Sequence, residues 1–97
     1  MTELNKVDAL LVKRGKKYGD VVDQAYVAEM IKGALRGGRT WAALDNVMKQ
    51  SLEVIALKMS RIVSGDPYHA DSWFDIEGYA KLGRNRCPGI ESDGGEV

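Results

Sequence analysis

Hydrophobic residues recur three and four positions apart along most of this 97-residue chain, which is the spacing of a helix face. The pattern predicts four helices, at about residues 3–13, 20–35, 41–63 and 72–82. Thr40 is the expected cap of the third helix, and Asp71 or Ser72 that of the fourth. A glycine follows each helix or lies near its end: Gly15, Gly37, Gly65 and Gly83. We therefore expect an all-α domain over residues 1–83, a compact bundle of about four helices in which the third is the longest.

The predicted third helix has a wide hydrophobic face. Its apolar residues cover nearly half of the circumference: Trp41, Leu44, Val47, Met48, Leu52, Val54, Ile55, Met59 and Ile62. One neighbouring helix would not cover such an arc. We therefore expect this helix to pack against two others or against a second subunit, and the chain to form a homo-oligomer.

Residues 84–97 show no hydrophobic period. They are rich in glycine and include an acidic stretch with Glu91, Asp93 and Glu96. A segment of this composition cannot bury enough apolar surface to become ordered alone. We expect a flexible acidic tail that orders only on a partner.

The balance of charges narrows the classes of partner. The chain carries 14 Lys and Arg and 14 Asp and Glu, so its formal net charge is zero. This balance argues against broad nonspecific nucleic-acid binding, which depends on an excess of basic residues. The single cysteine, Cys87, permits no intrachain disulfide and fits a reducing cytoplasm. The sequence has neither an apolar run of about 20 residues for a membrane span nor the start of a signal peptide, so we expect a cytoplasmic protein.

Two acids at the start of the predicted fourth helix are candidates for chemistry. Asp71 and Asp75 lie four residues apart and share a face, opposite the side of Trp73, Ile76 and Ala80 that is expected in the core. Carboxylates at this spacing can hold Mg²⁺, and Asp75 is a candidate catalytic residue. The alternative is that both acids only stabilise the positive end of the helix.

His69 is the only histidine and precedes this helix. It is the second candidate catalytic residue, because an imidazole can act as a base, a metal ligand or a donor to phosphate. The alternative is a solvated side chain, or one bonded to a nearby carboxylate.

The segment before the second helix is a candidate phosphate site. It is predicted to be a loop in which Gly15 lets backbone N–H groups approach an anion, while Lys16 and Lys17 supply charge. Tyr18 can stack on a base, and Asp23 falls near the apolar side of the next helix. The alternatives are also structural: basic residues offset the helix dipole, Tyr18 belongs to the core or an interface, and Asp23 favours the helix N-terminus.

Three runs of the sequence resemble a family of small bacteriophage and prophage domains of uncharacterised function. They are K-Y-G-D at 17–20, L-K-M-S-R-I at 57–62 and, most specific, D-S-W-F-D-I-E-G-Y-A at 71–80. The similarity extends over residues 10–83. It implies a helical domain that acts in the cytoplasm of a host cell. It also adds Arg61, in the second run, to the candidate ligand-binding residues.

A looser similarity is to the all-α nucleotide pyrophosphohydrolases of the MazG type. Those enzymes hold Mg²⁺ on paired acids from neighbouring helices, commonly E-x-x-E and E-x-x-D. Here Glu53 is followed three residues later by Ala56, so the chain departs from that pattern. The similarity implies a magnesium site on Asp71 and Asp75, with Asp23 as a further acid.

The sequence leaves two functions open. In the first, the chain binds a nucleotide or another phosphate ligand, either as a Mg²⁺-dependent nucleotide pyrophosphohydrolase or as a non-catalytic protein that sequesters the ligand. In the second, it is an oligomeric phage protein without catalytic activity. That protein would bind and inhibit a host or anti-phage defence protein through a helical face and the tail.

Overall fold

A computed structural model describes residues 3–90, and within this range the fold is all-α, as expected. The helices are α1 (Glu3–Tyr18), α2 (Val21–Arg36), α3 (Asn46–Ser64) and α4 (Ala70–Arg84), with a short 3₁₀ turn, η1 (Trp41–Ala43). α3 is the longest, at 19 residues. None of these helices is long and apolar enough to cross a membrane. The acidic stretch at 91–97 lies outside the described residues.

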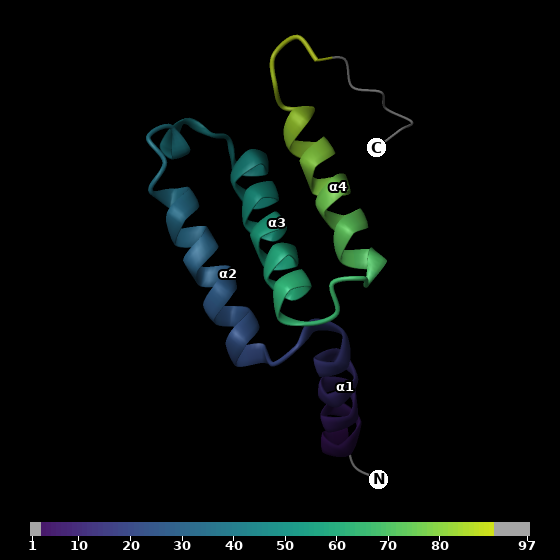
Figure 1. The fold of residues 1–97 in the computed structure, drawn as a ribbon. Coiled ribbons are helices and arrows are strands. Elements are labelled where there is room, and N and C mark those ends of the chain that lie inside the picture. The colour runs from purple at the N-terminus through teal and green to yellow at the C-terminus, as the bar shows by residue number, and fades with distance from the viewer. Residues whose placement is uncertain (1–2, 91–97) are drawn as a thin grey trace.

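α2, α3 and α4 lie side by side, and α1 extends away from them (Figure 1). α3 is the central element and packs against α2 on one side and α4 on the other. α1 joins the group only near its C-terminal end, beside the end of α3. The expectation that the third helix packs against two others is therefore confirmed.

Several of the buried side chains of α3 and α4 are small. Ser51, Ala56 and Ser60 of α3 and Ser72 of α4 are buried. Small residues let helix backbones approach closely, and the hydroxyl of Ser60 is satisfied because it donates to the Leu57 carbonyl oxygen at 2.6 Å. Ser51 faces α4, where a Cβ on Gly83 would lie 3.8 Å from the Ser51 Cβ, whereas Ser60 lies on the opposite side of α3, towards α2.

α4 is rotated from the orientation that the sequence suggests. Trp73 was expected in the core, but it is 55% exposed and its indole N–H donates to the Pro67 carbonyl oxygen at 2.9 Å. Ala80 is exposed as well. The inward face instead starts at the buried Ser72, and Asp75, one turn further on, pairs with Lys58 of α3.

Several predicted helix boundaries are wrong. α1 does not end before Gly15 but continues to Tyr18, so the expected basic loop is helical. α3 begins at Asn46 and is capped by Asp45, not Thr40, with Met48 N–H donating to the carboxylate at 2.8 Å. His69 occupies the N-cap position of α4, which runs on past Gly83. Glycine inside a helix costs only about 1 kcal/mol, so tertiary packing overrides it.

Candidate functional site

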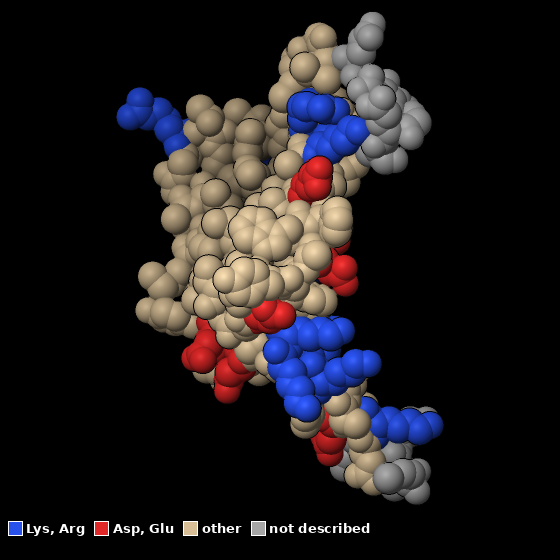
Figure 2. All heavy atoms as spheres, turned by 45° about the vertical axis from the view of Figure 1, so that its right-hand side comes forward, with Lys and Arg blue, Asp and Glu red and all other residues tan. Residues whose placement is uncertain are grey.

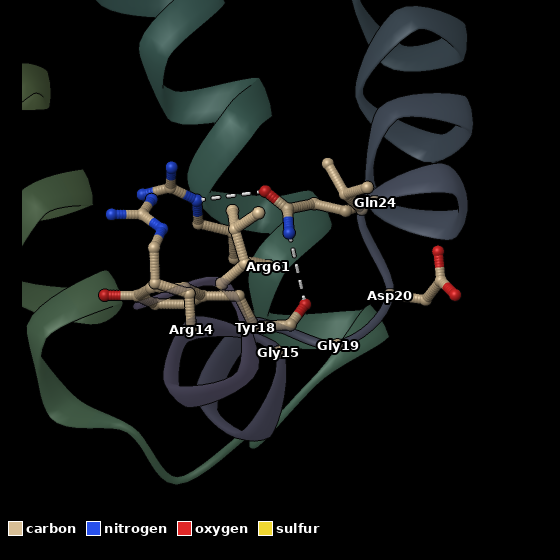
Figure 3. A pocket seen from close by; sticks show the side chains of 9 residues that line it. Arg14, Gly15, Tyr18, Gly19, Asp20, Gln24 and Arg61 are labelled. Atoms are coloured by element: carbon tan, nitrogen blue, oxygen red, sulfur yellow. Dashed lines mark hydrogen bonds between the residues drawn. The ribbon is translucent and has the colours of Figure 1, made fainter. Parts of the chain in front are cut away.

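A hollow of about 360 Å³ lies where the end of α1, the start of α2 and the end of α3 meet. Figure 3 shows the side chains around it. The polar lining comes from Arg14, Tyr18, Asp20, Gln24 and Arg61, and apolar walls come from Leu11 and Val21. A volume of this size is within the range of small-molecule sites.

Two arginines share the ring of Tyr18. The guanidinium carbon of Arg14 is 5.3 Å from the ring centroid, and that of Arg61 is 4.6 Å from it. Arg14 precedes Tyr18 by one helical turn on α1, whereas Arg61 comes from α3. Neither arginine forms an ion pair with any residue in the described range 3–90. Two positive charges therefore converge on one aromatic ring without a carboxylate partner.

Gln24 of α2 fixes the position of the Arg61 side chain. Arg61 Nε donates to the amide oxygen of Gln24 at 3.1 Å, and the Gln24 amide nitrogen donates to the Tyr18 carbonyl oxygen at 3.4 Å (Figure 3). This uses one of the five N–H donors of the guanidinium. No other hydrogen bond ties the Arg61 side chain to the part of the chain that the structure describes, so its terminal donors remain for a ligand.

One carboxylate borders the hollow. Asp20 is the N-cap of α2, and its Oδ1 accepts from the Val22 N–H at 2.7 Å. The start of the second helix was expected to receive a phosphate, but the Asp20 side chain already satisfies this N–H group. Anion affinity in the hollow therefore rests on Arg14 and Arg61, and the charge of Asp20 reduces it.

His69 lies against the same tyrosine. Its ring meets that of Tyr18 edge-on, with centroids 5.5 Å apart and an interplanar angle of 73°. His69 Nε2 is buried and has no hydrogen-bond partner, and the nearest carboxylate oxygen, from Asp71, is 3.6 Å away. The start of α4 is thereby placed beside the hollow, although His69 does not line it.

The two acids proposed for magnesium have different surroundings. Asp75 is paired with Lys58, whose Nζ lies 2.9 Å from its carboxylate, and the side chain of Asp71 is 78% exposed. Among residues 3–90 no group of three or more His, Cys, Asp or Glu side chains could hold a metal ion. Magnesium binding by Asp71 and Asp75 stays a prediction, and the arrangement of the described residues adds no further ligand to it.

The remaining candidates are spread over the surface. Lys17 lines a second, smaller hollow of about 200 Å³ on α1, together with Lys13, Arg14 and Tyr18. Lys16 is exposed on the same helix, and Asp23 is exposed on α2 outside the main hollow. Figure 2 shows Lys and Arg side chains gathered on the surface between the main body of the molecule and its projecting end.

Of the sequence-predicted ligand residues, the structure brings Tyr18 and Arg61 into one hollow. Arg14 and Gln24 were not singled out as site residues. Arg14 lies four positions before Tyr18, and this spacing places both on one helix face only if the helix continues to residue 18. Because the helix was expected to end at residue 13, the signal was present in the sequence but misread.

Within residues 3–90, the one ion pair whose pKa values are shifted is Asp45 with Arg86, and it lies away from this hollow. Arg86 Nε donates to Asp45 Oδ2 at 2.8 Å. This hydrogen bond, with that from Met48 N–H, holds the pKa of the Asp45 carboxyl below its ordinary value, and the pKa of Arg86 is raised. The pair joins the segment after α4 to the start of α3 and is structural.

The fold and the hollow define a small all-α protein with paired arginines at a helix junction. The chain belongs to the family described as domain of unknown function DUF6378, which matches residues 3–86. The matched range includes all the residues that line the hollow, as well as His69. Comparison with curated proteins and with solved structures gave no match.

Proposed function

We propose that this protein binds a phosphate-containing small molecule, with nucleotides as the expected class, in the hollow between Arg14, Tyr18 and Arg61. The observation that carries the proposal is the convergence of two guanidinium groups on one ring without an ion-pair partner. Two like charges held this close repel each other, and a bound anion removes the repulsion.

Arginine and phosphate match in geometry as well as in charge. The planar guanidinium offers parallel N–H groups that phosphate oxygens accept in pairs. Gln24 holds the Arg61 side chain in place, so little conformational entropy is lost on binding. The apolar walls made by Leu11 and Val21 suit the less polar part of a nucleotide.

Binding without catalysis is the form of the function that these contacts support best. The pyrophosphohydrolase alternative needs metal ligands, and Asp75 already has Lys58 as its partner. A non-catalytic protein of this kind would sequester a nucleotide. The resemblance to phage domains would place it in the cytoplasm of an infected cell.

Titration calorimetry of the full chain tests the proposal. The panel consists of inorganic phosphate, nucleosides, and nucleoside mono-, di- and triphosphates, each with and without Mg²⁺. We expect binding of phosphorylated compounds and none of the nucleosides. Arg61→Gln should weaken binding by roughly 10- to 100-fold, because a charge-assisted hydrogen bond contributes about 1.5–3 kcal/mol.

Two further variants make the test specific. Asp20→Asn should bind the same compounds more tightly, because it removes a negative charge while keeping an N-cap side chain. Arg39→Gln is the matched control, since Arg39 is exposed in the turn after α2 and lies outside the hollow. Unchanged affinity in Arg61→Gln, or no binding of any phosphorylated compound, would refute the proposal. If the wild type releases pyrophosphate from a nucleotide and Asp75→Asn does not, the function is hydrolysis rather than sequestration.

A further inference from the structure

The first half of α1 exposes an apolar stripe that no other helix within residues 3–90 covers. Val7, Leu10 and Leu11 lie on one side of the helix and are 50–59% exposed. An isolated helix of this length is at best marginally stable in water, and most helical stability in proteins comes from packing of an amphipathic face. We therefore expect the stripe to pack against a partner surface.

A second uncovered surface lies at the start of α4. Tyr68, Trp73 and Phe74 are 55–90% exposed and, with Pro67, Ala70 and Glu77, surround a shallow hollow of about 320 Å³. We call Tyr68, Trp73 and Phe74 the aromatic surface. Exposed aromatic groups of this density are typical of interaction sites rather than of free surface.

The two surfaces carry opposite charge. α1 contains five Lys and Arg but only two acids. Residues 66–77 contain four acids and no Lys or Arg, and only Asp75 among them is paired with a lysine, Lys58. The stripe is thus aliphatic and basic, and the aromatic surface is acidic. Complementary charges of this kind favour their association.

We infer that a second copy of this chain covers both surfaces, with the α1 stripe of each copy packed on the aromatic surface of the other. The stripe and the aromatic surface consist of six large side chains that are each at least half exposed, so a partner that covers both removes much apolar area from water. The zero net charge of the chain allows two copies to approach without overall repulsion.

The position of the two surfaces within one chain suits a two-fold axis. The end of α1 meets the loop before α4, where Asp66 N–H donates to the Lys17 carbonyl oxygen at 2.8 Å. From this junction α1 runs away from α4 (Figure 1). An axis near the junction would therefore bring each α1 onto the α4 of the other copy and form two equivalent contacts. Leu11 of the stripe also borders the hollow, but the pairing of the two surfaces requires no bound anion.

Zero-length carbodiimide cross-linking of the unmodified protein tests the contact directly. The reagent joins lysine amines to carboxylates, and an equal mixture of ¹⁵N-labelled and unlabelled chains distinguishes links between copies from links within one. We expect mixed-isotope peptides that join Lys6 or Lys13 to Asp71 or Glu77. Links found only within single copies would overturn the inference.

Light scattering of charge variants gives an independent test. The wild-type chain should have twice its mass of 10.7 kDa at micromolar concentrations. Val7→Asp would place a negative charge against the acidic aromatic surface of the other copy, and Phe74→Lys would place a positive charge against the basic stripe. Each variant alone should therefore weaken dimerisation at least about tenfold. Their mixture should form a heterodimer, because one contact is then wild type and the other pairs Asp with Lys.

Matched controls complete the experiment. Val12→Asp alters an exposed valine of α1 off the stripe, and Val63→Lys alters an exposed valine of α3. Both should remain dimers. A monomeric wild type, or folded Val7→Asp and Phe74→Lys variants that fail to associate when mixed, would overturn the inference. Circular dichroism shows whether each variant is folded. If either variant is unfolded, the cross-links of the unmodified protein test the inference instead.

Discussion

At the junction of α1 and α3, two glycines allow backbone segments to touch. Gly19 has a φ of +83°, and a Cβ there would collide with the Ser64 carbonyl. A Cβ on Gly65 would collide with the backbone of Lys17 and Tyr18. These contacts set the end of α1 against the end of α3. They therefore fix the distance between Arg14 and Arg61, which come from different helices.

Gly19→Ala should destabilise the protein strongly. The left-handed backbone costs about 1–2 kcal/mol for a residue with a Cβ, and relief of the collision adds to it. Gly15→Ala is the matched control, because a Cβ at that helical position meets nothing within 4 Å. It should stabilise the protein by about 0.5–1 kcal/mol. Urea unfolding monitored by circular dichroism measures both changes, and equal midpoints for the two variants would contradict this account.

At the scale of elements, a surface pair fastens the chain after α4 to the start of α3. Asp45 both caps α3 and accepts from Arg86, and these bonds lower the pKa of its carboxyl. A lowered pKa in the folded state means that the unfolded state binds protons more readily. The contribution to stability is therefore present above the unfolded pKa, about 3.9, and is lost as the pH falls through the folded pKa.

Arg86→Gln tests this pair. The variant should have a lower melting temperature than the wild type at neutral pH, because the hydrogen bond that holds Asp45 ionised is removed. The difference should be small, since both side chains are solvent-accessible, and it should shrink below the unfolded pKa of Asp45. Arg84→Gln is the control, because the Arg84 side chain bonds only its neighbour Asn85 among the described residues. A difference that grows in acid would contradict the sign argued here.

The molecule as a whole buries little apolar surface. Within residues 3–90 only Ala28, Ala56 and Ile62 are buried apolar residues. The radius of gyration is 16.1 Å, whereas a compact domain of this length has about 12.5 Å. An extended molecule with such a small core obtains stability from a shared surface, which is consistent with the inferred pairing of two copies.

The melting temperature should therefore depend on protein concentration. If the second copy binds only the folded chain, about a hundredfold increase in concentration should raise the melting temperature by roughly 5 °C or more. Differential scanning calorimetry over that range measures the shift. Val12→Asp should show the same dependence, and Val7→Asp a weaker one. A melting temperature independent of concentration in the wild type would argue for a chain that folds alone.

Local sequence determined the helical content of this protein. The four helices follow from apolar residues at helical spacing, and the wide face of α3 indicated its two neighbours, because both depend on periodicity within one segment. The sequence also pointed to Tyr18 and Arg61 as binding residues. It misplaced the C-terminal end of α1 and the start of α3, since Gly15 and Thr40 resemble helix boundaries when only neighbouring residues are considered.

Only the tertiary structure decided which faces turn inward and which arginines meet. Trp73 points outward and Ser72 inward, because α4 turns the side of Ser72 and Asp75 towards α3. Arg14 and Arg61 are 47 positions apart, and they share a ring because two glycines let α1 and α3 touch. Periodicity carries no information on such approaches, since they depend on the surface of the partner helix.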